Sequence, residues 1–137
     1  MNEYEIYIDG ASKGNPGHSG VGIVICSQGE VVKNIAHYIG ENTNNFAEYS
    51  ALIHALEEAL IMKAECVRIK SDSELLCRQI NKEYKVRNAN IIGLYRQAVH
   101  LMGAFKEVTV RHIPREENKG ADMLANKAVA DFLKKKS

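Results

Sequence analysis

The sequence predicts an α/β fold: a five-stranded mixed sheet, with three antiparallel strands followed by two parallel ones, flanked by helices. Two observations carry this prediction. Up to residue 39 the chain consists of alternating apolar runs separated by short turns, which is typical of an antiparallel meander. From residue 46 onward, segments with helical periodicity alternate with short β-branched runs, and a strand reached after a helix is usually parallel to a neighbour.

The meander begins with Tyr4 to Asp9, a run rich in aromatic and β-branched residues that ends in an acid. Residues 14–17 (Gly-Asn-Pro-Gly) predict a tight turn, because Gly permits positive φ and Pro presets φ. Strands at 20–26 and 31–39 follow, joined by a second short turn. A carboxylate at the edge of an apolar strand is costly unless it is paired, hydrogen-bonded or metal-bound, so Asp9 needs a partner.

Changes in the spacing of the apolar residues along the chain define the remaining helices and strands. A polar cluster at 40–45, rich in helix-capping side chains, precedes the first helical period. In chain order we then expect a helix at 46–63, a strand at 66–71, a helix through 75–80, a polar and basic connector at 81–90, a helix at 91–102, a strand at 107–112, a loop at 114–120 and a last helix from about 120.

Composition narrows the class of protein. A length of 137 residues suits one domain, which we expect to span 1–137. A hydrophobic content of 45% and a charged content of 26% exclude a disordered chain, and no apolar run is long enough to span a bilayer. The first residues lack the basic region and apolar core of a secretory signal. A net charge of +1 argues against tight non-specific binding of nucleic acid.

The cysteines indicate a reducing compartment. Cys26, Cys66 and Cys77 are odd in number and widely spaced, without a Cys-x-x-Cys pair. Reduced, partly buried thiols therefore fit better than a disulfide framework or a metal–thiolate site. We expect a cytoplasmic protein that does not associate with membranes.

Four acids stand at unusual places. Asp9 and Asp72 come where predicted strands stop, and Glu48 and Asp122 lie at the starts of helices, on their packing faces. In a mixed sheet covered by helices, these places can converge at one edge. Carboxylates gathered there would raise each other's pKa values unless cations compensate them. Oxygen ligands suit Mg²⁺ or Mn²⁺, and two such ions about 3.5–4 Å apart support phosphodiester hydrolysis by metal-activated water.

Each acid also has a structural explanation when it is taken alone. Asp9 can form a turn, Asp72 can cap the following helix, and Asp122 can interact favourably with a helix dipole. Glu48 is the hardest to explain in this way, because a helix N-terminus accounts for its charge but not for its place on the packing face. Order and spacing alone leave both the metal site and the structural roles open.

Four motifs, however, occur in a fixed order along the chain. They are Asp9-Gly10 with Gly14-Asn15-Pro16-Gly17, Thr43-Asn44-Asn45-Phe46-Ala47-Glu48, Ser71-Asp72-Ser73, and Asn118-Lys119-Gly120-Ala121-Asp122-Met123-Leu124-Ala125. In these motifs and in its order of elements, the chain resembles ribonuclease H of type 1 over essentially its whole length. The resemblance implies an RNase H-like fold and an endonuclease that cuts the RNA strand of RNA–DNA hybrids by two-metal-ion catalysis.

The resemblance also implies the metal ligands. Asp9, Glu48, Asp72 and Asp122 match the catalytic, metal-binding carboxylates of the family. The implied cofactor is a pair of Mg²⁺ ions, with Mn²⁺ as a substitute. We expect a monomer whose partner is the RNA–DNA hybrid, with no small-molecule cofactor.

Three asparagines match the family's contacts to the minor groove of the hybrid, where 2′-hydroxyls distinguish RNA from DNA. They are Asn15, Asn44 and Asn45, whose amides both donate and accept hydrogen bonds. Turn and cap chemistry explains the same three residues equally well. A fourth, Asn118, is expected to order the loop before Asp122.

One departure from the family concerns an assisting histidine. Some members place a His in the loop before the last acid, as a proton shuttle or an aid to product release. His112, ten residues before Asp122, is the candidate here. It closes a predicted strand and precedes Ile113-Pro114, which is stiffer than a mobile loop. Glu116 or Glu117 could assist instead, and a simple strand-end histidine is the alternative.

A second departure concerns substrate binding. The connector at 81–90 is too short for the basic helix-loop insertion with which some relatives grip their substrate. Lys82, Lys85 and Arg87 could supply a reduced version. Because Lys and Arg contact phosphates, binding should still be salt-sensitive, but weaker than in relatives with the insertion.

Two alternative functions stay open. The same fold and acids serve nucleases with other substrates, such as double-stranded RNA or branched DNA. A non-catalytic module that binds hybrids or a protein partner could also keep the fold. The intact set of four acids argues against the module, because binding alone needs no such mutual repulsion.

Overall fold

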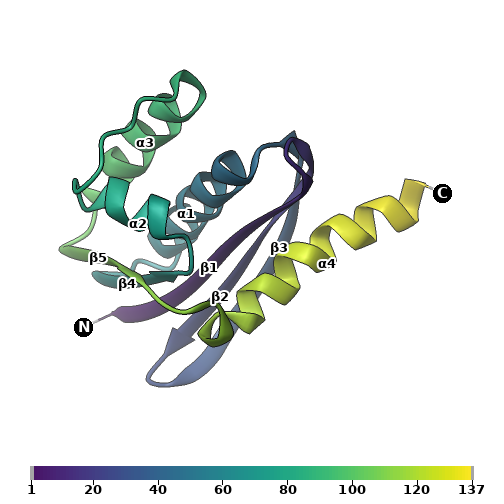
Figure 1. Ribbon diagram of the computed structural model, residues 1–137. Coiled ribbons are helices and arrows are strands. Elements are labelled where there is room, and N and C mark those ends of the chain that lie inside the picture. The colour runs from purple at the N-terminus through teal and green to yellow at the C-terminus, as the bar shows by residue number, and fades with distance from the viewer. Residues whose placement is uncertain (1, 137) are drawn as a thin grey trace.

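The computed structural model describes residues 2–136, which form a mixed sheet of five strands in the order β3-β2-β1-β4-β5 (Figure 1). The strands are β1 (Glu3–Gly14), β2 (Gly17–Ser27), β3 (Glu30–Asn42), β4 (Cys66–Ser71) and β5 (Glu107–His112). β2 runs antiparallel to β1 and β3, whereas β4 is parallel to β1 and β5. The predicted fold class is therefore confirmed.

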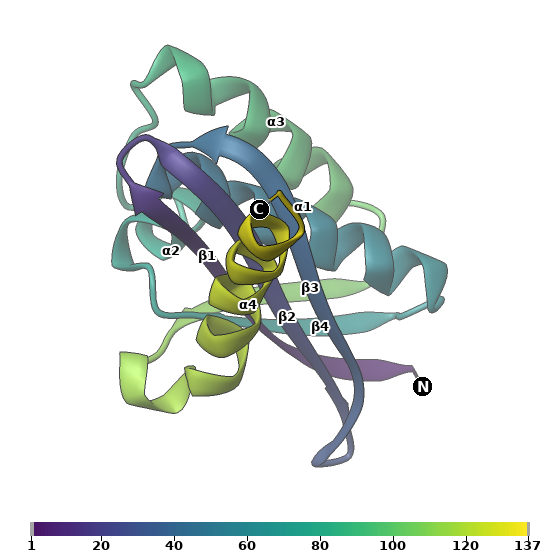
Figure 2. The same ribbon diagram turned by 90° about the vertical axis from the view of Figure 1, so that its right-hand side faces the viewer.

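Helices cover both faces of this sheet. They are α1 (Asn44–Ile61), α2 (Glu74–Ile80), α3 (Ala89–Met102) and α4 (Lys119–Lys136), with a 3-10 turn η1 (Arg115–Glu117) before α4. α1, α2 and α3 lie on one side of the sheet and α4 crosses the other (Figure 1 and Figure 2). The turn η1 occupies part of the segment that the sequence predicts to be a loop.

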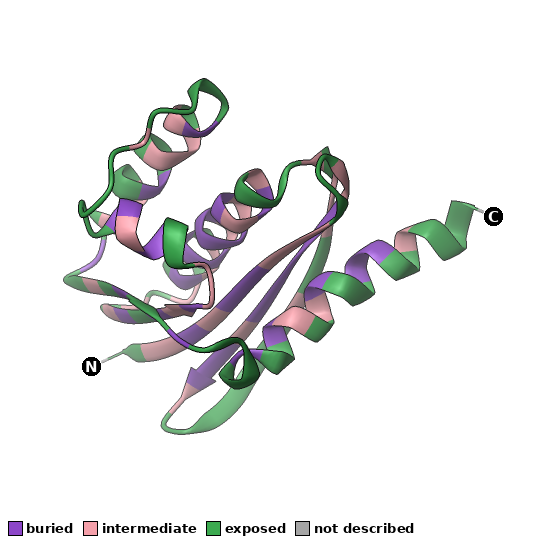
Figure 3. Cartoon of the chain, viewed as in Figure 1, coloured by how far each residue is buried: buried purple, intermediate pink, exposed green. Residues whose placement is uncertain are grey.

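The main core lies between the sheet and α1 (Figure 3). Alternating residues of β1 and β2, such as Ile6, Ile8 and Ile23, are fully buried in one cluster with Leu52 and Leu56 of α1. This agrees with the alternation of period two in the strands and the helical period in α1. The packing fixes the N-terminal turns of α1 over the middle of β1.

α4 packs on the opposite face because two glycines of β2 leave room for it. A Cβ at Gly22 would lie 2.0 Å from the carbonyl oxygen of Ala121, and one at Gly20 would lie 2.5 Å from that of Ala125. Any side chain there would push the helix away. The start of α4, including Asp122, is therefore held close to the centre of the sheet.

Asp9 lies inside β1, so the prediction that it closes a strand is wrong. It pairs with Gly22, and the antiparallel ladder with β2 continues as far as Gly14. The parallel ladder with β4 stops earlier, at Ile8 opposite Ser71. Asp9 is thus the first residue beyond the β1–β4 ladder, next to the end of β4. The physical reason is that β1 extends beyond β4 as one arm of a hairpin.

Two further expectations concern cysteines and membranes. Cys26, Cys66 and Cys77 take part in no disulfide within the described chain. Cys26 and Cys77 are buried, in keeping with the predicted buried thiols. Across residues 2–136, no helix combines the length and the apolar character needed to cross a bilayer.

Candidate active site

Three carboxylates meet at the edge of the sheet where β4 ends. Asp9, Glu48 and Asp72 each offer one oxygen, and these oxygens lie within 4.8 Å of one another. Asp122, in the first turn of α4, lines the same cleft. The structure thus gathers the four acids that the sequence analysis singled out. Polar neighbours complete the lining of the cleft, among them Asn44, Asn45, Arg115 and Asn126.

Glu48 is placed by the docking of α1 on β1. Thr43 caps the helix, and its hydroxyl accepts a hydrogen bond from the backbone N–H of Phe46. The backbone N–H of Gly10 donates to Glu48 Oε1 at 2.6 Å. A Cβ at Gly10 would lie 2.2 Å from the carbonyl carbon of Ala47, so only glycine allows this approach. Glu48 therefore sits beside Asp9, its neighbour across the helix–strand contact.

Asp72 follows β4 directly and does not cap α2. Ser73 is the N-cap, and its hydroxyl accepts a hydrogen bond from the backbone N–H of Leu76. The structural explanation for Asp72 from the sequence is therefore wrong. Asp72 Oδ2 instead accepts a hydrogen bond from Asn118 Nδ2 at 3.2 Å. Its carboxylate points into the cleft rather than serving a helix end.

Asp122 is held within its own helix. Asn126, one turn later, donates from Nδ2 to Asp122 Oδ1 at 3.2 Å and to the carbonyl oxygen of Asp122 at 2.9 Å. The backbone N–H of Asp122 donates to the carbonyl oxygen of Asn118 at 3.1 Å. These contacts hold Asp122 at the cleft, where its nearness to Asp9 adds to the raised pKa of Asp9.

Burial and repulsion dominate the electrostatics of the cleft. Asp9 is only 5% exposed. Its burial, together with the charges of Glu48 and Asp72, raises its pKa to about 9. Burial also raises the pKa of Glu48 to about 8, against the opposing effect of the hydrogen bond from Gly10. No ion pair within residues 2–136 joins any of the four acids to a Lys or Arg.

This donor set fits divalent cations of the Mg²⁺ and Mn²⁺ class. Carboxylates crowded together without a cationic partner are unfavourable, and a divalent cation bound by hard oxygen ligands relieves that repulsion. No thiol or imidazole of the described chain lines the cleft, which disfavours softer metals. Chemically, such a site can hold cations against the phosphates of a nucleic acid.

The three predicted substrate-contacting asparagines take two different places. Asn44 and Asn45 are exposed and line the cleft at the start of α1. Asn15 does not line it; its Oδ1 accepts a hydrogen bond from the backbone N–H of Asn44 at 3.1 Å. Asn15 therefore ties the β1–β2 hairpin to the start of α1, which is the turn and cap chemistry considered from the sequence.

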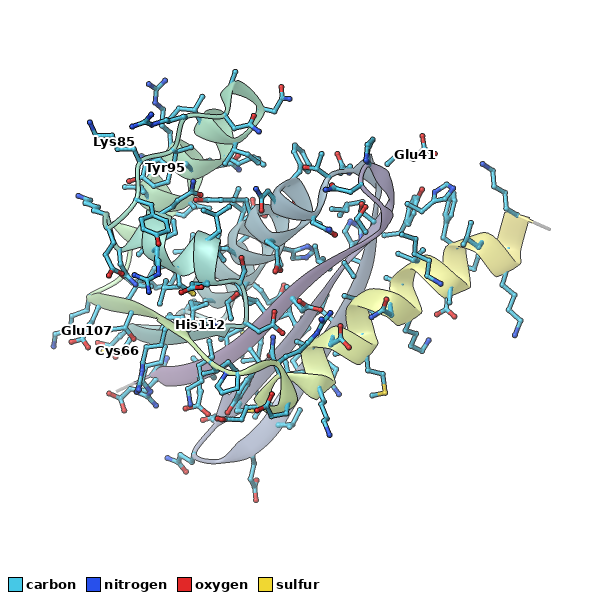
Figure 4. All side chains as sticks on the ribbon, viewed as in Figure 1. Glu41, Cys66, Lys85, Tyr95, Glu107 and His112 are labelled. Atoms are coloured by element: carbon cyan, nitrogen blue, oxygen red, sulfur yellow. The ribbon has the colours of Figure 1, made fainter. Side chains whose placement is uncertain are left out.

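His112 lies apart from the carboxylates. It is exposed at the end of β5 (Figure 4) and lines a second, smaller cavity together with Glu74 and Arg111. The loop residue that does line the cleft is Arg115, whose charge lowers the pKa of Glu48 in opposition to burial. Sequence reasoning missed Arg115, because nothing in the local pattern distinguishes it from other exposed cations.

The connector between α2 and α3 is short, as predicted, and carries Lys82, Lys85 and Arg87 on its surface. Lys85 extends outward beside α3 (Figure 4). None of the three takes part in an ion pair within the described residues. They remain available for contacts with phosphates, and their contribution to binding stays a prediction.

Comparison with known protein sequences gives independent information. The family model described as reverse transcriptase-like matches residues 7–128. Ribonuclease HI of Halobacterium salinarum is 38% identical over 126 residues, covering 91% of this chain and 63% of that protein. The bifunctional protein Rv2228c of Mycobacterium tuberculosis is 36% identical over 90% of this chain, but the match covers 35% of that protein. The chain therefore spans less than two thirds of the length of these relatives.

Solved structures agree with the sequence relatives. The crystal structure of RNase H1 from Halobacterium salinarum has a TM-score of 0.93 at 37% identity, covering 95% of this chain and 99% of that one. LC11-RNase H1, solved in complex with RNA/DNA hybrid, has a TM-score of 0.89 at 39% identity, with the same coverage of 95% and 99%. The fold and the order of elements are thus those of these proteins.

Proposed function

This chain belongs to the RNase H-like family, and from that premise we propose that it is an endonuclease that hydrolyses the RNA strand of RNA–DNA hybrids. One observation carries the proposal: Asp9, Glu48 and Asp72 hold oxygens within 4.8 Å of one another, with no ion-pair partner among the described residues. Such crowding is unfavourable without a bound cation, so it indicates a metal-dependent site. The complex of LC11-RNase H1 with an RNA/DNA hybrid supports the choice of substrate.

The proposed cofactor is a pair of Mg²⁺ ions, for which Mn²⁺ can substitute. Asp9, Glu48, Asp72 and Asp122 would hold them, because these are the acids that line the cleft. Bound ions of this kind supply a water of lowered pKa and neutralise charge on the attacking and leaving oxygens. The four carboxylates would provide the negative charge that retains these cations in the cleft.

The protein's polar side chains then select and orient the substrate. Asn44 and Asn45 line the cleft and offer amides that can both donate to and accept from a 2′-hydroxyl. Asn15 supports them indirectly through its bond to the backbone of Asn44. For the side chain that assists turnover we favour Arg115, which lies in the cleft, over His112, which lines the neighbouring cavity.

We further propose that residues 1–137 act as one domain and as a monomer. A single sheet with its helices supplies all four acids and the three asparagines. A cytoplasmic location fits the three cysteines, which form no disulfide within the described residues. The short connector after α2 favours weaker, salt-sensitive binding of the hybrid.

Cleavage of a labelled RNA–DNA hybrid in Mg²⁺, by the wild type and by Asp9→Asn, tests the proposal. We expect cleavage of the RNA strand by the wild type only, with the DNA strand intact. Double-stranded RNA and a branched DNA junction, run in parallel, test the alternative substrates. Binding of the hybrid without any cleavage would overturn the proposal in favour of a non-catalytic module.

A further inference from the structure

Asn118 is one of the few buried polar residues among those that the structure describes, with 1% of its surface exposed. It lies between η1 and α4, directly before the helix that carries Asp122. A buried amide is costly unless hydrogen bonds satisfy it, so its contacts indicate what keeps it there. The sequence analysis assigned it only to the ordering of the loop.

The amide of Asn118 connects separate parts of the candidate active site. Its Nδ2 donates to the carbonyl oxygen of Ile8 at 2.8 Å and to Asp72 Oδ2 at 3.2 Å. Ile8 immediately precedes Asp9, and the backbone carbonyl of Asn118 accepts a hydrogen bond from the N–H of Asp122. One residue therefore links β1, the end of β4 and the start of α4, and each of these segments supplies an acid.

The orientation of this amide follows from its neighbours. Both groups near Nδ2 are acceptors, so the nitrogen must face them and the oxygen must point away. Asn118 Oδ1 is buried and has no hydrogen-bond partner among the described residues. A buried unsatisfied acceptor typically costs about 1–3 kcal/mol. A residue kept only for loop stability would gain from a side chain that leaves no such acceptor.

We propose that Asn118 is a positioning residue that aims the carboxylate of Asp72 and thereby sets the affinity of the cleft for divalent cations. The inference rests on the proposed function and deepens it. An uncharged donor fixes the direction of a carboxylate without cancelling its charge, whereas Lys or Arg in this place would compete with the cation. Removal of a residue that hydrogen-bonds to a metal ligand and orients it typically lowers metal affinity or activity about 10–100-fold.

Asn126 provides a matched comparison within the same site. It also donates to an acid of the cleft, Asp122, at 3.2 Å, but its side chain is exposed. Water can replace an exposed hydrogen bond at little cost, whereas the Asn118 amide is itself buried and its bond to Asp72 is partly shielded from solvent. Removal of the two amides should therefore have unequal effects, although both touch acids of the same cleft.

The test measures Mn²⁺ binding by calorimetry without substrate, beside hybrid cleavage as a function of Mg²⁺ concentration. We expect Asn118→Ala to weaken Mn²⁺ binding and to raise the Mg²⁺ concentration for half-maximal activity, each by about tenfold or more. The KM for the hybrid at saturating Mg²⁺ should stay near the wild-type value. Asn126→Ala should weaken Mn²⁺ binding clearly less than Asn118→Ala does. Thermal melting without metal reports whether each variant is folded.

A double-mutant cycle separates positioning from a general structural role. If Asn118 acts through Asp72, its removal from Asp72→Asn should change Mn²⁺ affinity far less than its removal from the wild type. Additive effects, a folded Asn118→Ala with wild-type Mn²⁺ affinity, or unfolding of both Asn118→Ala and Asn118→Ser would overturn the inference. A wild type that binds Mn²⁺ but cuts no hybrid would refute the proposed function and leave the positioning role standing.

Discussion

Two of the glutamates of helix α1, Glu48 and Glu58, stand ten residues apart and have opposite surroundings. Glu58 forms an ion pair with Lys33 of the edge strand β3, and the rings of His37 and His54 meet edge-on beside it, 5.2 Å apart. Glu48 faces other acids in the cleft and has no such partner among the described residues. The comparison sets a glutamate whose charge is balanced by an ion pair beside one whose charge the proposed metal ions would balance.

The sharpest test of this comparison removes one acid from each region. Asp9→Asn should reduce cleavage of the hybrid by about a thousandfold or more, because a lost metal ligand removes several kcal/mol of transition-state stabilisation. The same change should raise the free energy of unfolding of the metal-free protein by about 1–2 kcal/mol, since folding no longer has to protonate and bury a carboxylate among other acids. Hybrid cleavage assays and urea unfolding at pH 7 measure the two effects.

Glu58→Gln is the matched control at the paired site. It breaks the ion pair with Lys33 and should lower the free energy of unfolding by about 0.2–1 kcal/mol without changing cleavage. If Asp9→Asn also destabilised the metal-free protein, burial and mutual repulsion of the acids in the cleft would not be destabilising the fold. The contrast between the two regions would then fail.

The next test concerns the approach of α1 to β1 that places Glu48 in the cleft. Gly10→Ala would put a Cβ 2.2 Å from the carbonyl carbon of Ala47, so the helix must shift. We expect a loss of about 1–3 kcal/mol in the free energy of unfolding, and weaker hybrid cleavage because Glu48 moves with the helix. Gly93→Ala in α3 is the control. A Cβ there meets nothing within 4 Å, so this change should stabilise the protein by about 0.5–1 kcal/mol.

The placement of the acids shows how far sequence reasoning reaches. The alternation of apolar residues in the strands and their helical spacing in α1 predicted the sheet and the helix that covers it. The acids on the packing faces of helices indicated that all four would meet at one edge of the sheet. The pattern failed for Asp9, because the sequence does not reveal that β1 extends past β4. It also left a capping role open for Asp72, which only the observed cap at Ser73 excludes.

The residues around the acids were harder to predict. Asn126 could have been found, because it stands four residues after Asp122 on one helix face. The bond from Asn118 to Asp72 and the place of Arg115 in the cleft depend on how η1 crosses the end of the sheet. Such contacts join segments far apart in the chain, and no local periodicity signals them.

A third test asks which loop side chain belongs to the cleft. Arg115→Ala should lower kcat/KM for the hybrid about tenfold or more, since a guanidinium facing a phosphate is worth about 1.5–3 kcal/mol. His112→Ala should change it less than about twofold, because His112 lines the other cavity. Rates measured from pH 6 to 9 extend the comparison. A larger loss for His112→Ala, or a changed pH profile, would instead support the assisting histidine.

The pH dependence of stability separates the cleft from the rest of the protein. The pKa of Asp9 is raised to about 9 and that of Glu48 to about 8, mainly by burial, so the folded state binds protons more tightly than the unfolded state. Stability without metal should therefore be greatest below pH 4 to 5 as far as these groups are concerned, and decline as pH rises toward 9. Added Mg²⁺ should flatten this decline, and Asp9→Asn should reduce it. A metal-free protein whose stability does not fall across this range would contradict the crowding of charge in the cleft.

The smallest effect is expected at His54, on the part of α1 that carries Glu58. There the change of stability with pH has the opposite sign. Burial, followed by the nearby His37, lowers the pKa of His54, so the unfolded state binds a proton more readily than the folded state. The contribution of His54 to stability is then present above its unfolded pKa of about 6.5 and is lost as pH falls below it. His54→Gln should remove this acid-side loss and leave the alkaline decline of the cleft intact, as unfolding in urea at pH 5, 7 and 9 would show. If both slopes changed together, the edge and the cleft would be coupled through α1 rather than independent.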